Sequence, residues 1–161
     1  MKRKIIIEPY EEEFATVNYY VVRFKGEEVL DFFQCFEKLS VDESIAGRFY
    51  IISEWLRTIG DEGGLNDHLI NEGGSLKAIP IVTSTLRLYC FKVNECIIIL
   101  GNGGHKPKNV RAYQDDPELN KYVSDLRETG RNLINRIRNS SKASIYQCKL
   151  YGNLEFEIET T

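Results

Sequence analysis

The amino-acid sequence predicts an α+β protein: an antiparallel sheet with a central hairpin, covered by two helices from the N-terminal half of the chain and one late helix. Three patterns indicate this fold. Two β-rich runs flank Asn94-Glu95, apolar residues recur at helical spacing over 27–39 and 41–59, and Asp115-Asp116-Pro117 begins a helix that reaches about Arg138. A chain of 161 residues is long enough to form one domain with a buried core.

The hairpin of residues 86–100 organises the expected sheet. Side chains alternate along a strand, so a turn at Asn94-Glu95 pairs Val93 with Cys96, Tyr89 with Leu100 and Arg87 with Asn102. The opposite face then holds the core residues Leu86, Leu88, Cys90, Ile97 and Ile99. Glycines at the end of the second strand leave the backbone there without side chains. If the strand continues past them, Lys106 and Lys108 lie on the same face as Arg87. We therefore expect a cationic cluster with a tyrosine at one end of one sheet face.

Both ends of the chain are expected to add strands to this core. Residues 2–10 and 16–25 are rich in β-branched and aromatic side chains, and 77–82 predict a strand that leads into the central hairpin. Residues 61–74 are expected to be a loop with a helical turn at 65–70. Alternating apolar residues and glutamates predict a last hairpin around Gly152-Asn153. The whole chain would be one domain, with 27–138 as its core and 1–25 and 144–161 as additional strands.

Charge and composition narrow the classes of function. A net charge of −3 and a pI near 5.5 argue against a surface that is basic throughout, although a local basic patch remains open. The arginines of the 117–138 helix are interpreted as its solvent face, because Glu118, Asp125 and Glu128 are interspersed with them. With only two histidines the chain gives little basis for a zinc site, and no cofactor is expected.

The residue pattern is typical of a cytoplasmic protein. The basic start at Met1–Lys4 is followed by only three isoleucines, so no signal-peptide core is present, and no apolar run has the length of a membrane span. The four cysteines have no metal-like spacing, and the expected register places Cys90 and Cys96 on opposite faces. We therefore expect reduced, structural thiols.

At the central stretch the sequence resembles the RelE/ParE-like toxins of bacterial type II toxin–antitoxin modules, and within them the HigB-like and ParE-like versions. The segments LRLYC, IIILGNGG and HKPKN carry this resemblance, together with the order of elements from Glu27 to about Arg138. The resemblance implies either an endoribonuclease that cuts messenger RNA, usually on the ribosome, or a poison of DNA gyrase that catalyses nothing. Either activity would be silenced by a cognate antitoxin protein.

Carried over by position, the resemblance makes Arg87 the arginine of the active face and matches Lys106 and Lys108 to the basic residues after the next strand. Metal-independent RNA cleavage needs cations for the developing negative charge and groups that take and give protons. Tyr89 and His105 are candidates for the proton transfers, and substrate contacts are expected from Lys77, Asn102 and Arg111.

Two functions stay open on this basis. The first is a toxin-like ribonuclease that acts through Arg87, Lys106 and Lys108. The second is a non-catalytic binding protein, either a gyrase inhibitor or a toxin fold that only docks a partner. The acidic pI and the lack of a placeable late catalytic acid favour the second.

Overall fold

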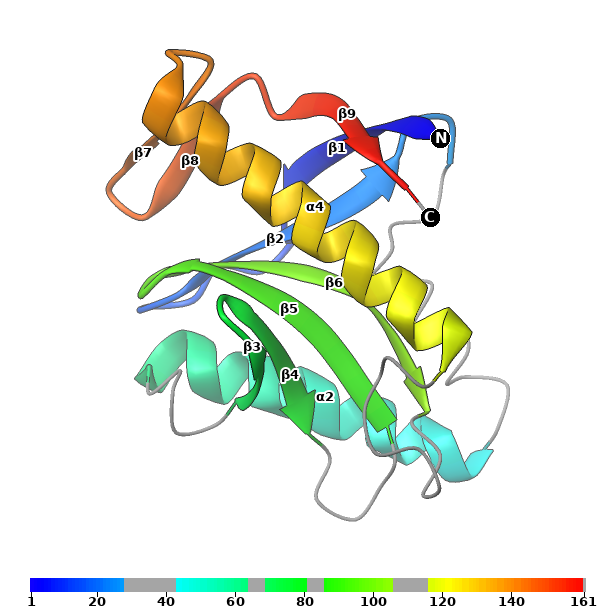
Figure 1. Cartoon of the computed structure of the whole chain (residues 1–161). Helices are drawn as coiled ribbons and strands as arrows, with labels where there is room; N and C mark the ends of the chain where they lie inside the picture. The colour runs from blue at the N-terminus through cyan, green and yellow to red at the C-terminus, as the bar shows by residue number, and fades with distance from the viewer. Residues whose placement is uncertain (28–42, 64–68, 81–85, 106–115, 161) are drawn as a thin grey trace.

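A seven-stranded sheet crosses the whole molecule (Figure 1). The structure is a computed structural model that describes residues 1–27, 43–63, 69–80, 86–105 and 116–160. The strand order is β3-β4-β5-β6-β2-β1-β9. These strands are β1 (Lys2–Pro9), β2 (Asn18–Phe24), β3 (Ile70–Gly73), β4 (Leu76–Pro80), β5 (Leu86–Asn94), β6 (Ile97–His105) and β9 (Glu155–Glu159).

The predicted architecture is wrong in its sheet and its helices. β2 and β6 run parallel, with Asn18 opposite Ile97 and Val21 opposite Leu100, so the sheet is mixed and not antiparallel. The described residues contain two helices, α2 (Glu43–Glu62) and α4 (Pro117–Asn139), where three were expected. The helix predicted for 27–39 lies outside the described residues apart from its first residue. The β1–β2 pair joins the hairpin across about 80 residues of sequence, and local patterns carry no information on such a pairing.

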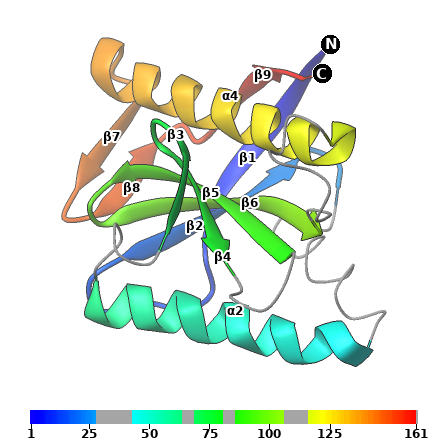
Figure 2. The same ribbon diagram turned by 60° about the horizontal axis from the view of Figure 1, so that its bottom comes forward.

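The two helices lie on opposite faces of the sheet, as Figure 2 shows. Beneath α4 the core contains alternating residues of six strands, including Ile5, Tyr20, Tyr89, Ile97 and Phe156. Beneath α2 a second core contains the residues of opposite parity, including Val21, Leu88, Cys90, Ile98 and Leu100. A sheet covered on both faces explains why its central strands are apolar in nearly every position.

Helix α4 begins as predicted. Asp116 caps it by accepting hydrogen bonds from the backbone N–H groups of Glu118 and Leu119, both at 3.0 Å, and Pro117 occupies the first turn. Leu119, Val123, Leu126 and Leu133 are buried against the sheet, in agreement with the predicted apolar side of the helix. Among the described residues, no helix is long and apolar enough to cross a membrane.

The register of the central hairpin differs from the prediction. The turn is Glu95-Cys96, because the Asn94 carboxamide accepts a hydrogen bond from the Cys96 N–H at 2.9 Å, and Asn94 pairs with Ile97. Between Asn94 and Lys92 the pairing then shifts by one residue, so that Phe91 pairs with Ile99. This irregularity places Ile97 and Ile99, and not Ile98 and Leu100, on the face that carries Tyr89. Further along, Leu88 pairs with Gly103 and Cys90 with Leu100, so two residues of β6 oppose Tyr89 in a β-bulge.

The last part of the chain also differs from its prediction. The hairpin near the C-terminus is β7 (Ala143–Tyr146) with β8 (Lys149–Gly152), a separate two-stranded sheet that turns at Gln147-Cys148. β9 follows Gly152-Asn153 but pairs with β1, so no hairpin forms there. In the 61–74 segment, predicted to be a loop, Ile70–Gly73 form β3, which pairs with β4, while residues 64–68 lie outside the described part. The residue pattern of a segment indicates that it is a strand, but not which partner it takes.

The expectation of reduced cysteines is wrong for two of the four. Cys96 and Cys148 form a disulfide with their Cα atoms 5.6 Å apart. It joins the β5–β6 turn to the β7–β8 turn across 52 residues of sequence, a contact that the spacing of the cysteines does not reveal. Cys90 is a free, buried thiol in the core beneath α2, and Cys35 lies outside the described residues.

Candidate anion-binding site

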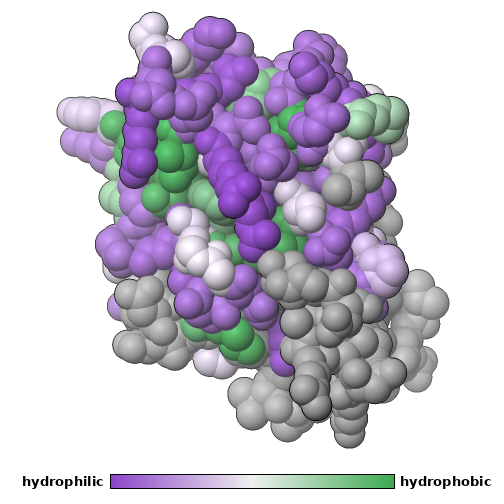
Figure 3. All heavy atoms as spheres, viewed as in Figure 1, coloured by the Kyte–Doolittle hydropathy of each residue, from purple (hydrophilic) through white to green (hydrophobic). Residues whose placement is uncertain are grey.

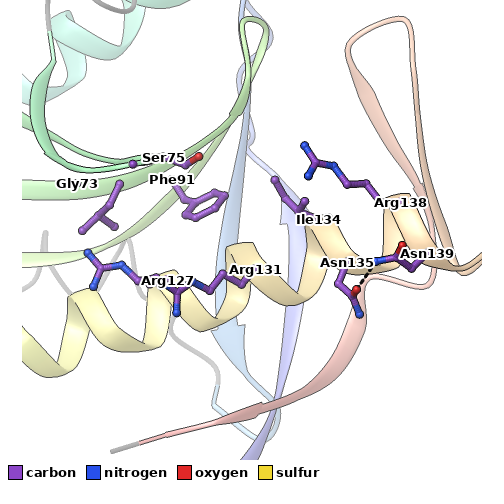
Figure 4. A pocket seen from close by; sticks show the side chains of 11 residues that line it. Gly73, Ser75, Phe91, Arg127, Arg131, Ile134, Asn135, Arg138 and Asn139 are labelled. Carbon is purple, nitrogen blue, oxygen red and sulfur yellow. Dashed lines mark hydrogen bonds between the residues drawn. The ribbon is translucent and has the colours of Figure 1, made fainter.

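A cleft of about 630 Å³ lies between the β3–β4 turn and the C-terminal half of α4 (Figure 4). This volume is within the range of pockets that hold small ligands in proteins. We call it the arginine cleft and define it by Gly73, Gly74, Phe91, Arg127, Arg131 and Arg138. Leu76, Ile134, Ser75, Asn135 and Asn139 complete its lining.

The fold builds the floor of the arginine cleft from backbone and apolar groups. Leu76 on β4 pairs with Phe91 on β5, and both are buried. Gly73 and Gly74 turn the chain above them with φ values of 118° and 57°, which glycine adopts without steric cost. The turn therefore presents bare backbone to the cleft, where a side chain would otherwise fill the space.

The wall of the arginine cleft is cationic because of residue spacing on α4. Arg127, Arg131 and Arg138 are separated by four and seven residues, which places them along one side of a helix. The guanidinium of Arg127 reaches to 3.7 Å from the point where a side chain on Gly73 would begin, so it points across the cleft. Arg131 lies 3.8 Å from Glu128, and Arg138 is exposed with no ion pair to any described carboxylate. The planar guanidinium group favours oxyanions such as phosphate and carboxylate, which it can bind through two parallel hydrogen bonds.

The cleft lacks the groups that proton transfer needs. Among the described residues, its lining contains neither a carboxylate nor a histidine. The polar side chains besides arginine are Ser75, Asn135 and Asn139, and the Asn139 amide donates to the Asn135 carboxamide oxygen. Arginine side chains beside neutral polar groups are suited to binding an anion.

An aromatic surface continues from the end of α4. The register of the β7–β8 hairpin places Ser144, Tyr146, Lys149 and Tyr151 on one face, which we call the tyrosine face. The other face packs Ala143, Ile145 and Leu150 against the core. Tyr146 is 64% exposed and Tyr151 is 47% exposed, so both rings are open to solvent.

The interpretation of the sequence did not identify the basic charge of this region. From 129 to 154 the chain carries five basic residues and no acidic residue, although the whole protein is net negative. The acidic residues used to interpret α4 as a solvent face all precede residue 129. On the α4 side of the molecule, hydrophilic side chains cover most of the surface between smaller hydrophobic patches (Figure 3). A count of charge by segment would have shown this basic region.

Three of the predicted site residues share one face of the sheet in the structure. Tyr89 is fully buried in the core beneath α4, and Arg87, half-buried, is two residues away on the same strand and therefore on the same face. The bulge brings Asn102 to this face as well, where it lines a small pocket beside Lys121 and Asp125 of α4. Its carboxamide accepts a hydrogen bond from the Gly103 N–H at 2.8 Å.

The other predicted site residues do not join this group in the described part of the chain. Lys77 alternates with Leu76 and Ala78 on β4, so it is on the opposite face from Arg87, and its ammonium donates to Asn71 at 3.3 Å. The backbone of His105 ends β6 opposite Leu86. Lys106, Lys108 and Arg111 lie outside the described residues.

Fold and site together define a mixed α+β protein with an arginine-lined cleft on its α4 side. Comparison with models of known protein families, with curated proteins and with solved structures finds no match.

Proposed function

We propose that this protein binds single-stranded nucleic acid without cleaving it. Phosphates would occupy the arginine cleft, and bases would stack on the tyrosine face. The observation that carries the proposal is the basic region of 129–154, free of acidic residues, which borders both surfaces.

The arginine cleft supplies the electrostatic part of binding. Its arginines lie across from Gly73 and Gly74, so a phosphate can approach the guanidinium groups without displacing a side chain at these two positions. The protein as a whole has a net charge of −3, so the surface outside the cleft repels a polyanion. The attraction is therefore confined to the region of the cleft. The binding should therefore depend on the few cations at the cleft.

The tyrosine face supplies the preference for single strands. An exposed aromatic ring can stack on an unpaired base, whereas the bases of a duplex are already stacked on one another. Lys149 sits between the two tyrosines in the hairpin register, opposite Tyr146, where it can contact the phosphate of a stacked nucleotide. The hairpin begins four residues after α4 ends, so the two surfaces are close in the chain.

Fluorescence anisotropy with labelled oligonucleotides tests the proposal. Single-stranded RNA and DNA of about 12 nucleotides are compared with a duplex of equal length and with heparin, at low and moderate salt. We expect binding to the single strands that is tighter than to the duplex, with the RNA and DNA arms naming the preferred sugar. Absence of binding to either single strand at low salt would contradict the proposal, and equal affinity for duplex and single strand would contradict the role of the tyrosines.

The ribonuclease predicted from the RelE/ParE-like resemblance remains a separate prediction, as do the gyrase target and the antitoxin partner. The same oligonucleotides distinguish it from a binding protein, because a ribonuclease shortens the RNA and a binding protein leaves it whole. Regulated expression provides a second test: growth arrest that Arg87→Ala and Lys106→Ala abolish would favour the ribonuclease.

A further inference from the structure

We propose that the Cys96–Cys148 disulfide is a redox-operated clasp that fixes the tyrosine face to the main sheet and so controls nucleic-acid binding. The regulatory part rests on the proposed function, while the clasp itself rests on the geometry of two hairpin turns.

The disulfide joins the tips of two hairpins. Cys96 is the second residue of the β5–β6 turn, and Cys148 is the second residue of the β7–β8 turn. Gln147 and Cys148 have φ values of 49° and 60°, as the tight two-residue turn of a hairpin requires. The bond is thus at the point of β7–β8 that is farthest along the chain from its attachments to α4 and β9.

Hydrogen bonds to Asn18 and Tyr20 of β2 also hold this tip. The Asn18 side chain donates to the Cys148 carbonyl at 2.6 Å, while its backbone N–H donates to the Cys96 carbonyl at 2.8 Å. The Tyr20 hydroxyl accepts a hydrogen bond from the Leu150 N–H at 2.8 Å. These bonds align the two turns, so the two thiols of the reduced protein would still meet and the bond could re-form. The hairpin also packs Ala143, Ile145 and Leu150 against the core, so reduction should loosen its tip more than its base.

The two sulfur atoms differ in setting from the free thiol. Cys96 and Cys148 are half-buried at the molecular surface, whereas Cys90 is fully buried beneath α2. A small dithiol can therefore reach the disulfide. It gives two electrons and two protons: the bond between the two sulfur atoms breaks, two cysteine thiols form, and the dithiol closes to its own cyclic disulfide.

Reduction of the disulfide should make the tyrosine face, which is proposed to bind nucleic acid, more mobile. The tyrosine face is part of the hairpin that the disulfide holds, and the strand before the turn continues from the last turn of α4, which carries Arg138. In the reduced protein the hairpin tip is more mobile, so binding a nucleic acid costs more conformational entropy. We expect the affinity of the reduced protein for single strands to fall by at least about fivefold, the lower end of typical coupling between sites.

Two readouts on the full chain test the clasp. Peptide mapping without reductant should find Cys96 linked to Cys148, and hydrogen exchange should show faster exchange in β7–β8 after treatment with dithiothreitol, with β5 and β6 unchanged. Cys148→Ser should behave as the reduced protein in both redox states, whereas Cys90→Ala should respond to dithiothreitol as the wild type does. Equal exchange in the two states, or no linked peptide, would overturn the clasp.

Anisotropy with the single-stranded oligonucleotide then tests the regulation. Tighter binding by the oxidised protein supports it, and equal affinity of both forms overturns it even where exchange differs. If the oxidised protein binds no oligonucleotide, the proposed function fails together with its regulation, and the exchange result still decides whether the clasp exists.

Discussion

Gly130 on α4 lies directly over the ring of Phe91 on β5, so close that a Cβ at position 130 would overlap the ring atoms. This contact sets the distance between α4 and the sheet at the inner end of the arginine cleft, because Phe91 is part of the cleft lining. A small residue at one helical position thus fixes the depth of the site.

Gly130→Ala should destabilise the protein. In an exposed helix this substitution stabilises by about 1 kcal/mol, but here the added methyl group forces α4 away from Phe91, and overpacking of this kind costs about 1–3 kcal/mol. We expect a lower thermal midpoint by calorimetry. Ser124→Ala on the same helix is the matched control and should leave the midpoint nearly unchanged. A rise of the midpoint for Gly130→Ala would contradict the close packing.

Loss of the disulfide should lower the free energy of unfolding substantially. The bond closes a loop across 52 residues, and the chain-entropy model assigns about 4 kcal/mol to a loop of this size. Urea denaturation of Cys96→Ala, compared with the oxidised wild type, measures the difference. The wild type in dithiothreitol should match the variant. Equal midpoints with and without reductant would show that the bond contributes nothing to stability.

The thiol of Cys90 should be inert in the folded protein. Burial raises the pKa of this thiol to about 12 from an ordinary value of 9.0, so almost no thiolate forms at neutral pH. Iodoacetamide at pH 8 should label Cys90 only after unfolding. Between pH 9 and 12 the unfolded chain loses this proton while the folded chain keeps it, so the free energy of unfolding should fall as pH rises. Rapid labelling of the native protein would contradict the burial.

The two tyrosines should act through their rings and not their hydroxyl groups. Stacking of a base on an aromatic side chain contributes about 1–3 kcal/mol, so Tyr146→Ala should weaken single-strand binding by about fivefold or more. Tyr146→Phe and Tyr151→Phe should retain the affinity, because phenylalanine keeps the stacking surface. Anisotropy measures both. Equal loss for the alanine and phenylalanine variants would mean that a hydroxyl hydrogen bond, and not stacking, is responsible.

The elements that the sequence predicts well are those with local signals. Asp116 and Pro117 locate the start of α4 because a cap and a first-turn proline act within four residues. The strands β1, β2 and β4 lie close to their predicted positions because their β-branched and aromatic side chains are also a local signal. Their partners do not follow from local signals, since the parallel pairing of β2 with β6 and the edge position of β9 depend on contacts between distant segments.

The candidate site depends on details that spacing does not reveal. The turn lies one residue later than predicted, where the Asn94 side chain bonds to the Cys96 N–H. A register shift between Lys92 and Asn94 then changes which residues of β6 lie beside Tyr89. The arginines predicted to form a solvent face of α4 lie across a cleft from the β3–β4 turn. No pattern in residues 61–74 indicated that this turn would reach α4.

The salt dependence of single-strand binding tests the central claim most directly. Each phosphate neutralised on a single strand adds about −0.7 to the slope of log K against log salt. Replacing Arg127, Arg131 and Arg138 together with glutamine should therefore make the slope shallower by about 2, whereas the matched variant with Lys2, Lys4 and Arg57 replaced should keep the wild-type slope. An unchanged slope in the first variant, or an equal loss in both, would show that the arginine cleft does not hold the phosphates.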